Sequence, residues 1–147
     1  MSGFLLDTNV VSELVKPGPE LRVRAWISAT DEGLLYLSVL TLGEIRKGIT
    51  ALRDPGRRVA LEAWLDGDLA VRFARRILPV DQAVADRWGR MAAEAKVAGL
   101  PLPVLDGLLA ATAMQHDLTL VTCNTKDVLR TRVPVFNPWI DQPIENW

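Results

Sequence analysis

Short apolar runs recur along the chain and stop abruptly at polar or turn-forming residues. A short run bounded in this way is typical of a strand that is buried on both faces of a parallel sheet. The first run, Phe4-Leu5-Leu6, ends on a carboxylate. On this pattern we predict five strands, at residues 4–6, 34–39, 77–80, 118–122 and 133–136.

Between these runs, apolar residues recur at a spacing near 3.6 residues, which predicts helices. The predicted helices cover residues 10–15, 19–29, 40–52, 81–98 and 104–116, with a helical turn at 125–129. Residues 57–76 are expected to form a protruding helical hairpin that breaks near Asp66-Gly67-Asp68. Trp88 falls on the apolar stripe of its helix and is expected in the core. Strands that alternate with helices predict an α/β fold, in which helices cover both faces of a parallel sheet.

The composition narrows the class of protein. With 147 residues, 49% of them hydrophobic and 24% charged, the chain has the size and apolar content of one globular domain. We therefore expect a single domain over residues 1–147, with a C-terminal tail at 137–147. A single cysteine, Cys123, and a single histidine, His116, exclude an internal disulfide framework and a metal centre built from soft ligands. The apolar runs are too short for a signal peptide or a membrane span, so a cytoplasmic protein is expected.

The charge is nearly balanced overall but uneven along the chain. The formal net charge is −1, yet residues 46–76 hold eight basic and four acidic residues, a local charge of +4. A basic flank of this kind suits a protein that holds a polyanion such as RNA. The candidate RNA-binding residues are Arg46, Lys47, Arg53 and Arg57. A solvated helical face explains the same charges, and from the charge pattern alone it is the simpler interpretation.

Three carboxylates stand where a predicted strand gives way to a helix or where a helix begins. Asp7 follows the first strand, Glu44 lies in the first turns of the helix after the second strand, and Asp106 is the only charge in an apolar stretch that begins another helix. In a parallel sheet these positions meet at one edge, where α/β proteins place their chemistry. Taken singly, each carboxylate is explained as a cap or an exposed first-turn residue. Together the three predict one acidic site.

Polar residues beside these carboxylates are candidates to support them. Thr8 and Asn9 directly follow the first carboxylate and are expected to position it and to contact a phosphate group. After the fourth strand, Thr122 offers a hydroxyl that can orient a carboxylate, and Asn124 or Asp127 offers another oxygen at the same edge. A turn followed by a helix cap also explains that polar run.

Carboxylates gathered in one place repel one another unless a cation lies among them. Oxygen ligands without histidine or cysteine select Mg²⁺, with Mn²⁺ as the alternative. Such an ion holds a phosphate oxygen, lowers the pKa of bound water and stabilises charge on the leaving oxygen. This chemistry suits the hydrolysis of a phosphodiester.

With these residues in place, the chain resembles the PIN-domain ribonucleases, in particular the VapC-type toxins of type II toxin-antitoxin (VapBC) modules. The resemblance covers essentially the whole chain and includes a closing segment, Val135 to Trp139, that is similar to the family's C-terminal strand. The matching motifs, in order, are Leu5-Leu6-Asp7-Thr8-Asn9 with Ser12-Glu13-Leu14, Ser38-Val39 through Glu44-Ile45 with Gly48-Ile49, the run from Leu102 to Ala113, and Leu120-Val121-Thr122 with Asn124 and Asp127.

The resemblance implies a PIN-like fold with a five-stranded parallel sheet. It implies a metal-dependent endoribonuclease with Asp7, Glu44 and Asp106 as its acidic triad, and tRNA or rRNA as its substrate. It also implies a toxin homodimer and inhibition by a VapB-type antitoxin whose C-terminal segment occupies the groove.

Two positions depart from the family's pattern. Asn124 is neutral where many relatives carry an acidic residue, which leaves Asp127 or a water molecule to complete the metal shell. Cys123 stands where many relatives carry a basic residue. These departures concern the fourth corner of the site and leave the triad intact.

Two other functions stay open at this point. An aspartate at a strand end also suits the covalent nucleophile of a phosphatase or phosphotransferase, but haloacid-dehalogenase-type enzymes usually place a second aspartate two residues on, where this chain has Asn9. Trapping of a phospho-aspartate would support that alternative. The other alternative is a non-catalytic interaction module, which a metal titration would distinguish from a nuclease.

Overall fold

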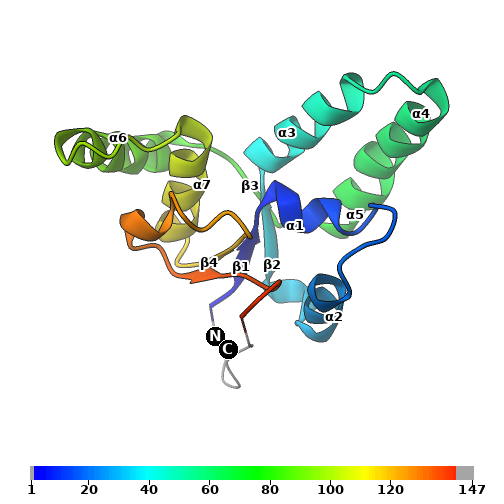
Figure 1. The fold of residues 1–147 in the computed structure, drawn as a ribbon, viewed down its shortest axis with the longest axis horizontal. Coiled ribbons are helices and arrows are strands. Elements are labelled where there is room, and N and C mark those ends of the chain that lie inside the picture. The colour runs from blue at the N-terminus through cyan, green and yellow to red at the C-terminus, as the bar shows by residue number, and fades with distance from the viewer. Residues whose placement is uncertain (1, 142–147) are drawn as a thin grey trace.

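The computed structural model describes residues 2–141 and contains a sheet of five parallel strands (Figure 1). In chain order they are β1 (Phe4–Leu6), β2 (Leu35–Ser38), β3 (Ile77–Leu78), β4 (Thr119–Val121) and β5 (Val135–Phe136). Across the sheet the order is β3-β2-β1-β4-β5, so that β1 lies at the centre. The predicted α/β fold with a five-stranded parallel sheet is confirmed.

Helices cover both faces of this sheet, as predicted (Figure 1). They are α1 (Thr8–Ser12), α2 (Leu21–Ala29), α3 (Val39–Thr50), α4 (Pro55–Ala63), the π-helix η2 (Trp64–Leu69), α5 (Ala70–Arg72), α6 (Gln82–Val97) and α7 (Val104–Gln115). Two short 3-10 turns, η1 (Glu32–Leu34) and η3 (Leu129–Thr131), complete the described chain.

The alternation of side chains along β1 divides the core in two. Phe4 and Leu6 join a cluster with residues of α1, α2, α3 and η2, whereas Leu5 joins a cluster with residues of α7. On the first face Trp26 packs edge-on against Phe4, with 5.1 Å between the ring centroids. Each β1 side chain is at most 1% exposed. The continuous apolar run therefore marks a strand buried on both faces, and the polar residues that follow it emerge at the sheet edge.

The projecting hairpin is formed by α3 and α4, and the predicted break within residues 57–76 is wrong (Figure 1). The turn falls before α4, where the Asp54 carboxylate accepts hydrogen bonds from the Gly56 and Arg57 backbone N–H groups. The chain then continues from α4 through η2 into α5. The wider turn of a π-helix accommodates the Asp-Gly-Asp sequence while Leu65 and Leu69 stay buried.

Smaller differences concern element ends and one aromatic residue. Strand β2 begins at Leu35, after the η1 turn. The predicted helical turn at 125–129 is present, closed by a hydrogen bond from the Leu129 N–H to the Thr125 carbonyl at 3.0 Å, and η3 continues from it. Trp88 is half-buried and belongs to neither core cluster, contrary to the prediction. The reason is that α6 packs mainly on α7, so its apolar stripe faces a helix more than the sheet.

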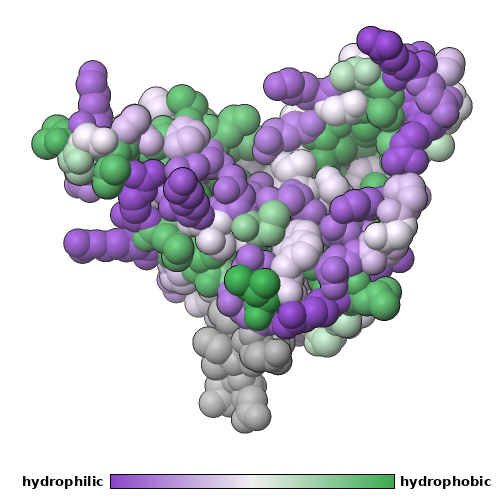
Figure 2. Space-filling view, in the orientation of Figure 1, coloured by the Kyte–Doolittle hydropathy of each residue, from purple (hydrophilic) through white to green (hydrophobic). Residues whose placement is uncertain are grey.

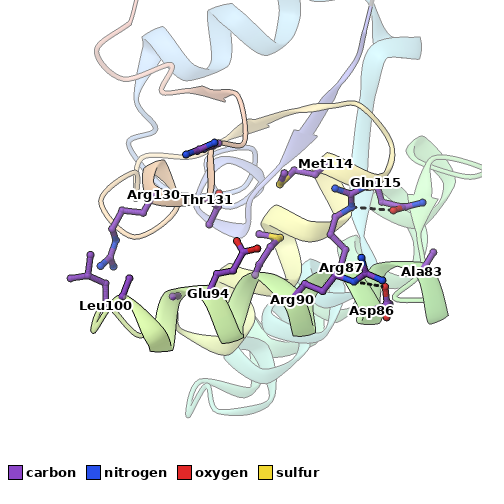
Figure 3. Close-up of a pocket in the computed structure, with 14 residues that line it drawn as sticks. Ala83, Asp86, Arg87, Arg90, Glu94, Leu100, Met114, Gln115, Arg130 and Thr131 are labelled. Carbon is purple, nitrogen blue, oxygen red and sulfur yellow. Dashed lines mark hydrogen bonds and ion pairs between the residues drawn. The ribbon is translucent and has the colours of Figure 1, made fainter.

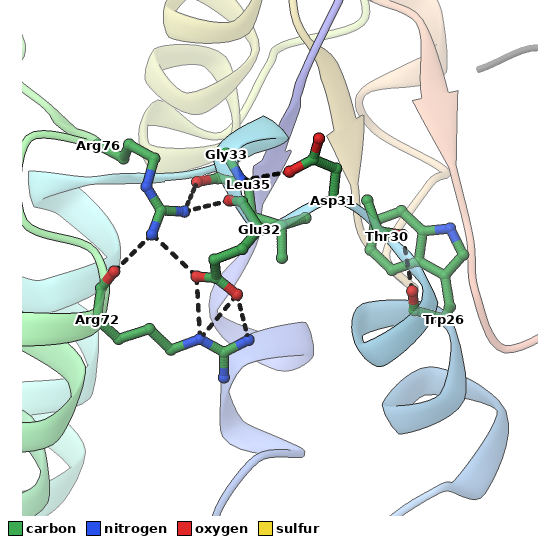
Figure 4. Close-up of polar contacts among 8 residues, drawn as sticks. All are labelled: Trp26, Thr30, Asp31, Glu32, Gly33, Leu35, Arg72 and Arg76. Carbon is green, nitrogen blue, oxygen red and sulfur yellow. Dashed lines mark hydrogen bonds and ion pairs between the residues drawn. The ribbon is translucent and has the colours of Figure 1, made fainter.

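Arg72 and Arg76 tie the end of α5 to the start of β2 (Figure 4). Arg76 donates to the Leu35 carbonyl at 2.7 Å and to Glu32 Oε2 at 2.9 Å, and Arg72 Nη2 donates to Glu32 Oε1 at 2.9 Å. The hydrogen bond from Arg72 is the largest cause that lowers the pKa of Glu32, against the opposing effect of burial. This clamp holds the amino edge of the sheet, opposite the edge that carries Asp7.

The predicted C-terminal tail at 137–147 is described only as far as Asp141. In that part the Asn137 backbone N–H donates to the Asp141 carboxylate at 2.8 Å, which closes a turn after β5. Residues 142–147 lie outside the described chain. Within residues 2–141, no helix combines the length and apolar character needed to span a bilayer.

Candidate active site

The carboxyl edge of the sheet faces a hollow between two arms of the molecule. One arm is formed by α6 and α7 and the other by α3 and α4, and the space-filling view shows the notch between them (Figures 1 and 2). The end of β1 and the starts of α1 and α3 lie between the arms (Figure 1). This arrangement places the first two predicted carboxylates beside open space.

Asp7 is held in a fixed orientation where β1 passes into α1. Its backbone N–H continues the parallel ladder by donating to the Val121 carbonyl at 2.9 Å. Its Oδ1 accepts from the Thr8 N–H at 2.7 Å and caps α1, while its Oδ2 accepts from the Thr122 hydroxyl at 2.8 Å and from Asn9 Nδ2 at 3.2 Å. Both carboxylate oxygens are thus positioned by neutral donors, which leaves the negative charge uncompensated.

Asn9 and Thr122 link α1 to the loop that follows β4. Asn9 Nδ2 lies 3.2 Å from Thr122 Oγ1, and its Oδ1 accepts from the Cys123 backbone N–H at 3.3 Å. The Thr122 hydroxyl oxygen also accepts from the Asn124 backbone N–H at 3.0 Å. The supporting positions predicted at Asn9 and Thr122 therefore form one network around the first carboxylate.

Glu44 reaches the same place from α3. Ser38 caps this helix by accepting from the Leu40 N–H at 3.0 Å, so the helix starts directly at the carboxyl end of β2. Glu44 Oε1 accepts from the Thr8 hydroxyl at 2.9 Å. Because Thr8 also donates its backbone N–H to Asp7, this residue connects the two carboxylates.

Asp106 approaches from the first turn of α7. Burial raises the pKa of Asp106, and the negative charges of Asp7, Asp127 and Glu44 raise it further, in that order. Like charges shift a pKa in this way only when they lie close enough to repel. None of the ion pairs within residues 2–141 involves Asp7, Glu44 or Asp106. The charges of Asp7 and Glu44 are thus close enough to Asp106 to raise its pKa. The assignment of the three carboxylates as catalytic residues stays a prediction.

For the fourth position of the predicted site, the side chain of Asp127 is better placed than that of Asn124. Asp127 is half-buried, pairs with Arg130 at 3.1 Å and contributes to the raised pKa of Asp106. Asn124 is exposed, and its backbone rather than its side chain contacts Thr122. Of the two alternatives, the geometry favours Asp127 as the additional oxygen at this edge.

The donor chemistry of this edge fits a hard divalent cation, because it offers carboxylate oxygens with uncompensated charge. The side chains as they stand do not form a closed coordination shell. In the described part of the chain, no group of three or more Asp, Glu, His or Cys residues is arranged to hold a metal ion. Binding of an ion therefore requires side-chain rotation at the carboxylates, and a metal site here stays a prediction.

The predicted RNA-binding residues differ in their environment. Arg46 forms an ion pair with Asp66 of η2, so its charge is compensated within the protein. Lys47 lies one turn after Glu44 on α3 and is exposed. Arg53 and Arg57 are exposed on either side of the turn between α3 and α4. The last three have no ion-pair partner within residues 2–141, whereas Arg46 has one, and the role of all four in RNA binding stays a prediction.

A separate groove of about 910 Å³ lies between α6, the end of α7 and η3 (Figure 3). Arg87 Nε donates to Gln115 at 3.1 Å across it, and Arg90 pairs with Asp86 at 3.2 Å. None of the three central carboxylates lines this groove. Its basic side chains are mostly engaged with neighbours, so the groove does not replace the acidic edge as the candidate site.

Glu13 is a buried carboxylate that the sequence did not single out for a role. It is 3% exposed, accepts from Lys16 Nζ at 3.3 Å and accepts from the Glu20 backbone N–H at 3.0 Å. It thereby ties the loop between α1 and α2 to the end of α1. Glu13 follows the last residue of the short helix α1, a position where a glutamate is expected to be exposed. No local sequence signal predicts its burial.

The sequence matches the PIN domain family over residues 4–132. The chain therefore belongs to the PIN-domain family, as the resemblance of its motifs indicated.

Two relatives are similar over nearly their whole length. Toxin FitB of Neisseria gonorrhoeae is 40% identical over 94% of this chain and 99% of its own. VapC ribonuclease Y4jK of Sinorhizobium fredii is 36% identical over 92% of this chain and 97% of its own. These relatives carry the names of a toxin and a ribonuclease.

Solved structures agree with this placement. The crystal structure of FitAcB from Neisseria gonorrhoeae superposes with a TM-score of 0.89 at 39% identity, covering 93% of this chain and 99% of that one. A member of the VapBC family of toxin-antitoxin systems, VapBC-5 from Mycobacterium tuberculosis, superposes with a TM-score of 0.60 at 25% identity, covering 88% and 90%. The five-stranded PIN fold is shared with both.

Proposed function

We propose that this protein is a metal-dependent endoribonuclease that acts as the toxin of a toxin-antitoxin module. The observation that carries the proposal is the convergence of Asp7, Glu44 and Asp106 from three separate segments of the chain. Folding brings like charges together at a cost, which a protein recovers when the group binds a cation. The ribonuclease and toxin names of the relatives support the same reaction class.

The triad Asp7, Glu44 and Asp106 would hold Mg²⁺ or Mn²⁺, with Asp127 as a further oxygen. When bound, such an ion supplies Lewis-acid chemistry, since it neutralises phosphate charge and lowers the pKa of a coordinated water. The proposed reaction is hydrolysis of an RNA phosphodiester that leaves a 5′-phosphate and a 3′-hydroxyl.

The chain's own contribution is the orientation of these carboxylates. Thr8 holds Glu44 through its hydroxyl, and Thr122 with Asn9 holds Asp7. Neutral donors fix the two carboxylates without removing their charge, which keeps them available to a cation. Lys47, Arg53 and Arg57 would then contact the RNA backbone from the arm that adjoins Glu44.

The proposal is tested by removing one carboxylate charge at a time. Asp7→Asn and Asp106→Asn should each abolish RNA cleavage in the presence of Mg²⁺ or Mn²⁺, because each removes a charged ligand while conserving side-chain shape. Cleavage of total cellular RNA is followed by end sequencing, and circular dichroism checks that both variants stay folded.

The matched control is Asp86→Asn, which makes the same chemical change at an exposed ion pair on α6. This variant and the unchanged protein should both cleave RNA and lose activity in EDTA. Full activity of a folded Asp7→Asn or Asp106→Asn protein would contradict the assignment.

The substrate class that we propose is tRNA or rRNA, as the resemblance implies, with single-stranded loops as the cleaved regions. End sequencing after induced expression would identify the cleaved molecules. Both substrates are cytoplasmic, so we place the protein in the cytoplasm.

We further propose a VapB-type antitoxin as the protein partner. Exposed apolar side chains flank the acidic edge on both arms, namely Val39 at the start of α3 and Val104 with Leu105 at the start of α7. A C-terminal antitoxin segment in this notch would cover them and exclude RNA. Co-expression with a small protein encoded beside this gene should suppress cleavage and yield a complex. The toxin itself is proposed to be a homodimer, which its mass in solution would test.

The phosphatase alternative is less favoured by the geometry. Asn9, two residues after Asp7, donates its side-chain amide to that carboxylate and is tied to the Cys123 backbone. It therefore occupies the general-acid position with a neutral group that supports Asp7. The proposal of a non-catalytic module predicts no binding in a Mn²⁺ titration.

A further inference from the structure

Gly107, the residue after Asp106, lets α6 approach the start of α7 very closely. A methyl group at this position would lie 3.0 Å from Cδ1 and 3.1 Å from Nε1 of Trp88. It would also lie 2.9 Å from Cδ2 of Leu102, in the loop that precedes α7. The glycine is thus enclosed between an aromatic ring and the incoming chain.

The start of α7 has no side-chain cap to fix it. Its N-cap position is Pro103, which offers no side-chain acceptor, and the Gly107 N–H makes the first helical bond to the Pro103 carbonyl at 2.9 Å. The other candidate ligands sit at capped starts, since Asp7 itself caps α1 and Ser38 caps α3. No side-chain cap fixes the first turn of α7, so the packing at Gly107 is the contact that fixes the turn carrying Asp106.

The indole of Trp88 is positioned by packing and not by a hydrogen bond from its N–H group. Its Nε1 is buried and finds no hydrogen-bond partner within residues 2–141. A buried N–H without a partner costs free energy that a leucine at this position would avoid. The ring offsets part of this cost through the apolar area that it buries, and its rigid edge lies directly against Gly107.

From these contacts we propose that Trp88 is a positioning residue for Asp106. Its ring fixes the height and rotation of the first turn of α7 through Gly107, and so sets where the Asp106 carboxylate meets Asp7 and Glu44. The proposal rests on the metal-dependent function described above, and it extends the site to a helix that carries none of the proposed ligands.

The test uses two variants that disturb the contact from opposite sides. Gly107→Ala adds a methyl against the ring, and Trp88→Leu removes the rigid edge while leaving an apolar side chain. Each should weaken Mn²⁺ binding, measured by calorimetry on the isolated protein, by about tenfold or more. Each should also lower kcat for RNA cleavage while KM changes by less than about threefold, because the proposed RNA-binding residues lie on the other arm.

A third variant separates positioning from simple loss of structure. In the double variant Gly107→Ala/Trp88→Leu, the flexible leucine relieves the contact with the ring, and only the terminal methyl of Leu102 has to shift. Mn²⁺ binding should therefore be tighter than in Gly107→Ala alone. Losses that instead add in the double variant would overturn the proposal. So would unchanged Mn²⁺ affinity in either single variant.

The matched control is Gly89→Ala, next to Trp88 on the same helix. A methyl at Gly89 meets no atom within 4 Å, so this variant should bind Mn²⁺ and cleave RNA like the unchanged protein. If the unchanged protein neither binds Mn²⁺ nor cleaves RNA, the proposed function fails. If it does both and Gly107→Ala matches it, only the positioning role of Trp88 fails.

Discussion

Thr8 connects two carboxylates of the acidic edge, because its two polar groups donate hydrogen bonds to different carboxylates. The backbone N–H orients Asp7 and the hydroxyl orients Glu44. Removal of the hydroxyl would take this donor from Glu44, whereas Asp7 would keep its hydrogen bonds from Thr122 and Asn9. The Thr8 side chain therefore sets where Glu44 points relative to Asp7.

We predict that Thr8→Val lowers RNA cleavage by about tenfold to a hundredfold, as is usual when a group that orients a metal ligand is removed. Valine conserves the shape of threonine but cannot donate to Glu44. Thr8→Ser should retain most of the activity, since the hydroxyl stays. Cleavage rates under Mg²⁺ saturation provide the measurement, and Thr50→Val, an exposed position on α3, is the control. Equal rates for the valine and serine variants would remove Thr8 from the site.

At this scale the sequence predicts the charges better than their partners. Asp7, Glu44 and Asp106 are recognisable because each follows or begins an apolar segment, and parallel topology then brings them to one edge. That Thr122 donates to Asp7 across 115 positions of sequence depends on the pairing of β1 with β4. The ion pair of Arg46 with Asp66 depends likewise on how α3 packs on η2. The place of Thr122 directly after a predicted strand indicates the first interaction, whereas the ion pair has no local signal.

Ion pairs between elements contribute to stability by an amount that can be measured. The clearest example is the clamp that Glu32 forms with Arg72 and Arg76. The pKa of Glu32 is lowered in the folded protein, so it favours folding above the ordinary carboxyl pKa of 4.5, and this contribution is lost as the pH falls through the lowered value. We predict that Glu32→Gln reduces the free energy of unfolding by less than about 1 kcal/mol at pH 7, since the side chain is 47% exposed.

Urea unfolding at pH 7 and at pH 3 checks this prediction. The difference between Glu32→Gln and the unchanged protein should shrink at the lower pH, because pH 3 lies below the ordinary carboxyl pKa of 4.5, where this contribution to stability declines. Glu94→Gln, an exposed change on α6, should alter stability little at either pH. A difference that grew on acidification would contradict the assigned direction.

Two glycines differ in whether a neighbouring atom leaves room for a side chain. A methyl at Gly3 would lie 2.6 Å from the Leu34 backbone carbonyl oxygen, whereas a methyl at Gly48 meets nothing within 4 Å. We predict that Gly48→Ala stabilises the protein by about 0.5–1 kcal/mol through helix propensity. Gly3→Ala should destabilise it, because backbone must move. Thermal unfolding of the pair measures both signs, and a stabilised Gly3→Ala would refute the close packing beside β1.

The sequence predicts the elements correctly where burial decides them. The prediction fails where a turn signal competes with a helix. The apolar run of β1 is buried on both faces, as expected. The Asp66-Gly67-Asp68 sequence indicates a break, but burial of Leu65 and Leu69 keeps the helix continuous in π form. Trp88 lies on an apolar stripe that meets α7, and a periodic pattern does not say which neighbour it faces.

At the scale of the whole molecule, the predicted site combines acidic residues at the sheet edge with basic residues on one arm. The predicted carboxylates lie toward the carboxyl edge of the sheet, and the exposed basic residues Lys47, Arg53 and Arg57 belong to the arm formed by α3, α4 and the turn between them. A polyanion drawn to that arm would meet the acidic edge only if cations screened it. Binding and cleavage should therefore respond differently to changes on the two sides.

We predict that replacing Lys47, Arg53 and Arg57 together by alanine weakens RNA binding and flattens its salt dependence, by about one in log–log slope for each phosphate group that a removed side chain neutralised. Binding is measured by fluorescence anisotropy in the Asp7→Asn background, where RNA is not consumed, from low to moderate salt. Arg75→Ala is the control, since Arg75 is exposed just before β3 at the opposite edge of the sheet. Arg46→Ala should have a smaller effect than Lys47→Ala, because Asp66 already neutralises Arg46. An unchanged salt slope in the triple variant would show that RNA approaches from the other arm, formed by α6 and α7.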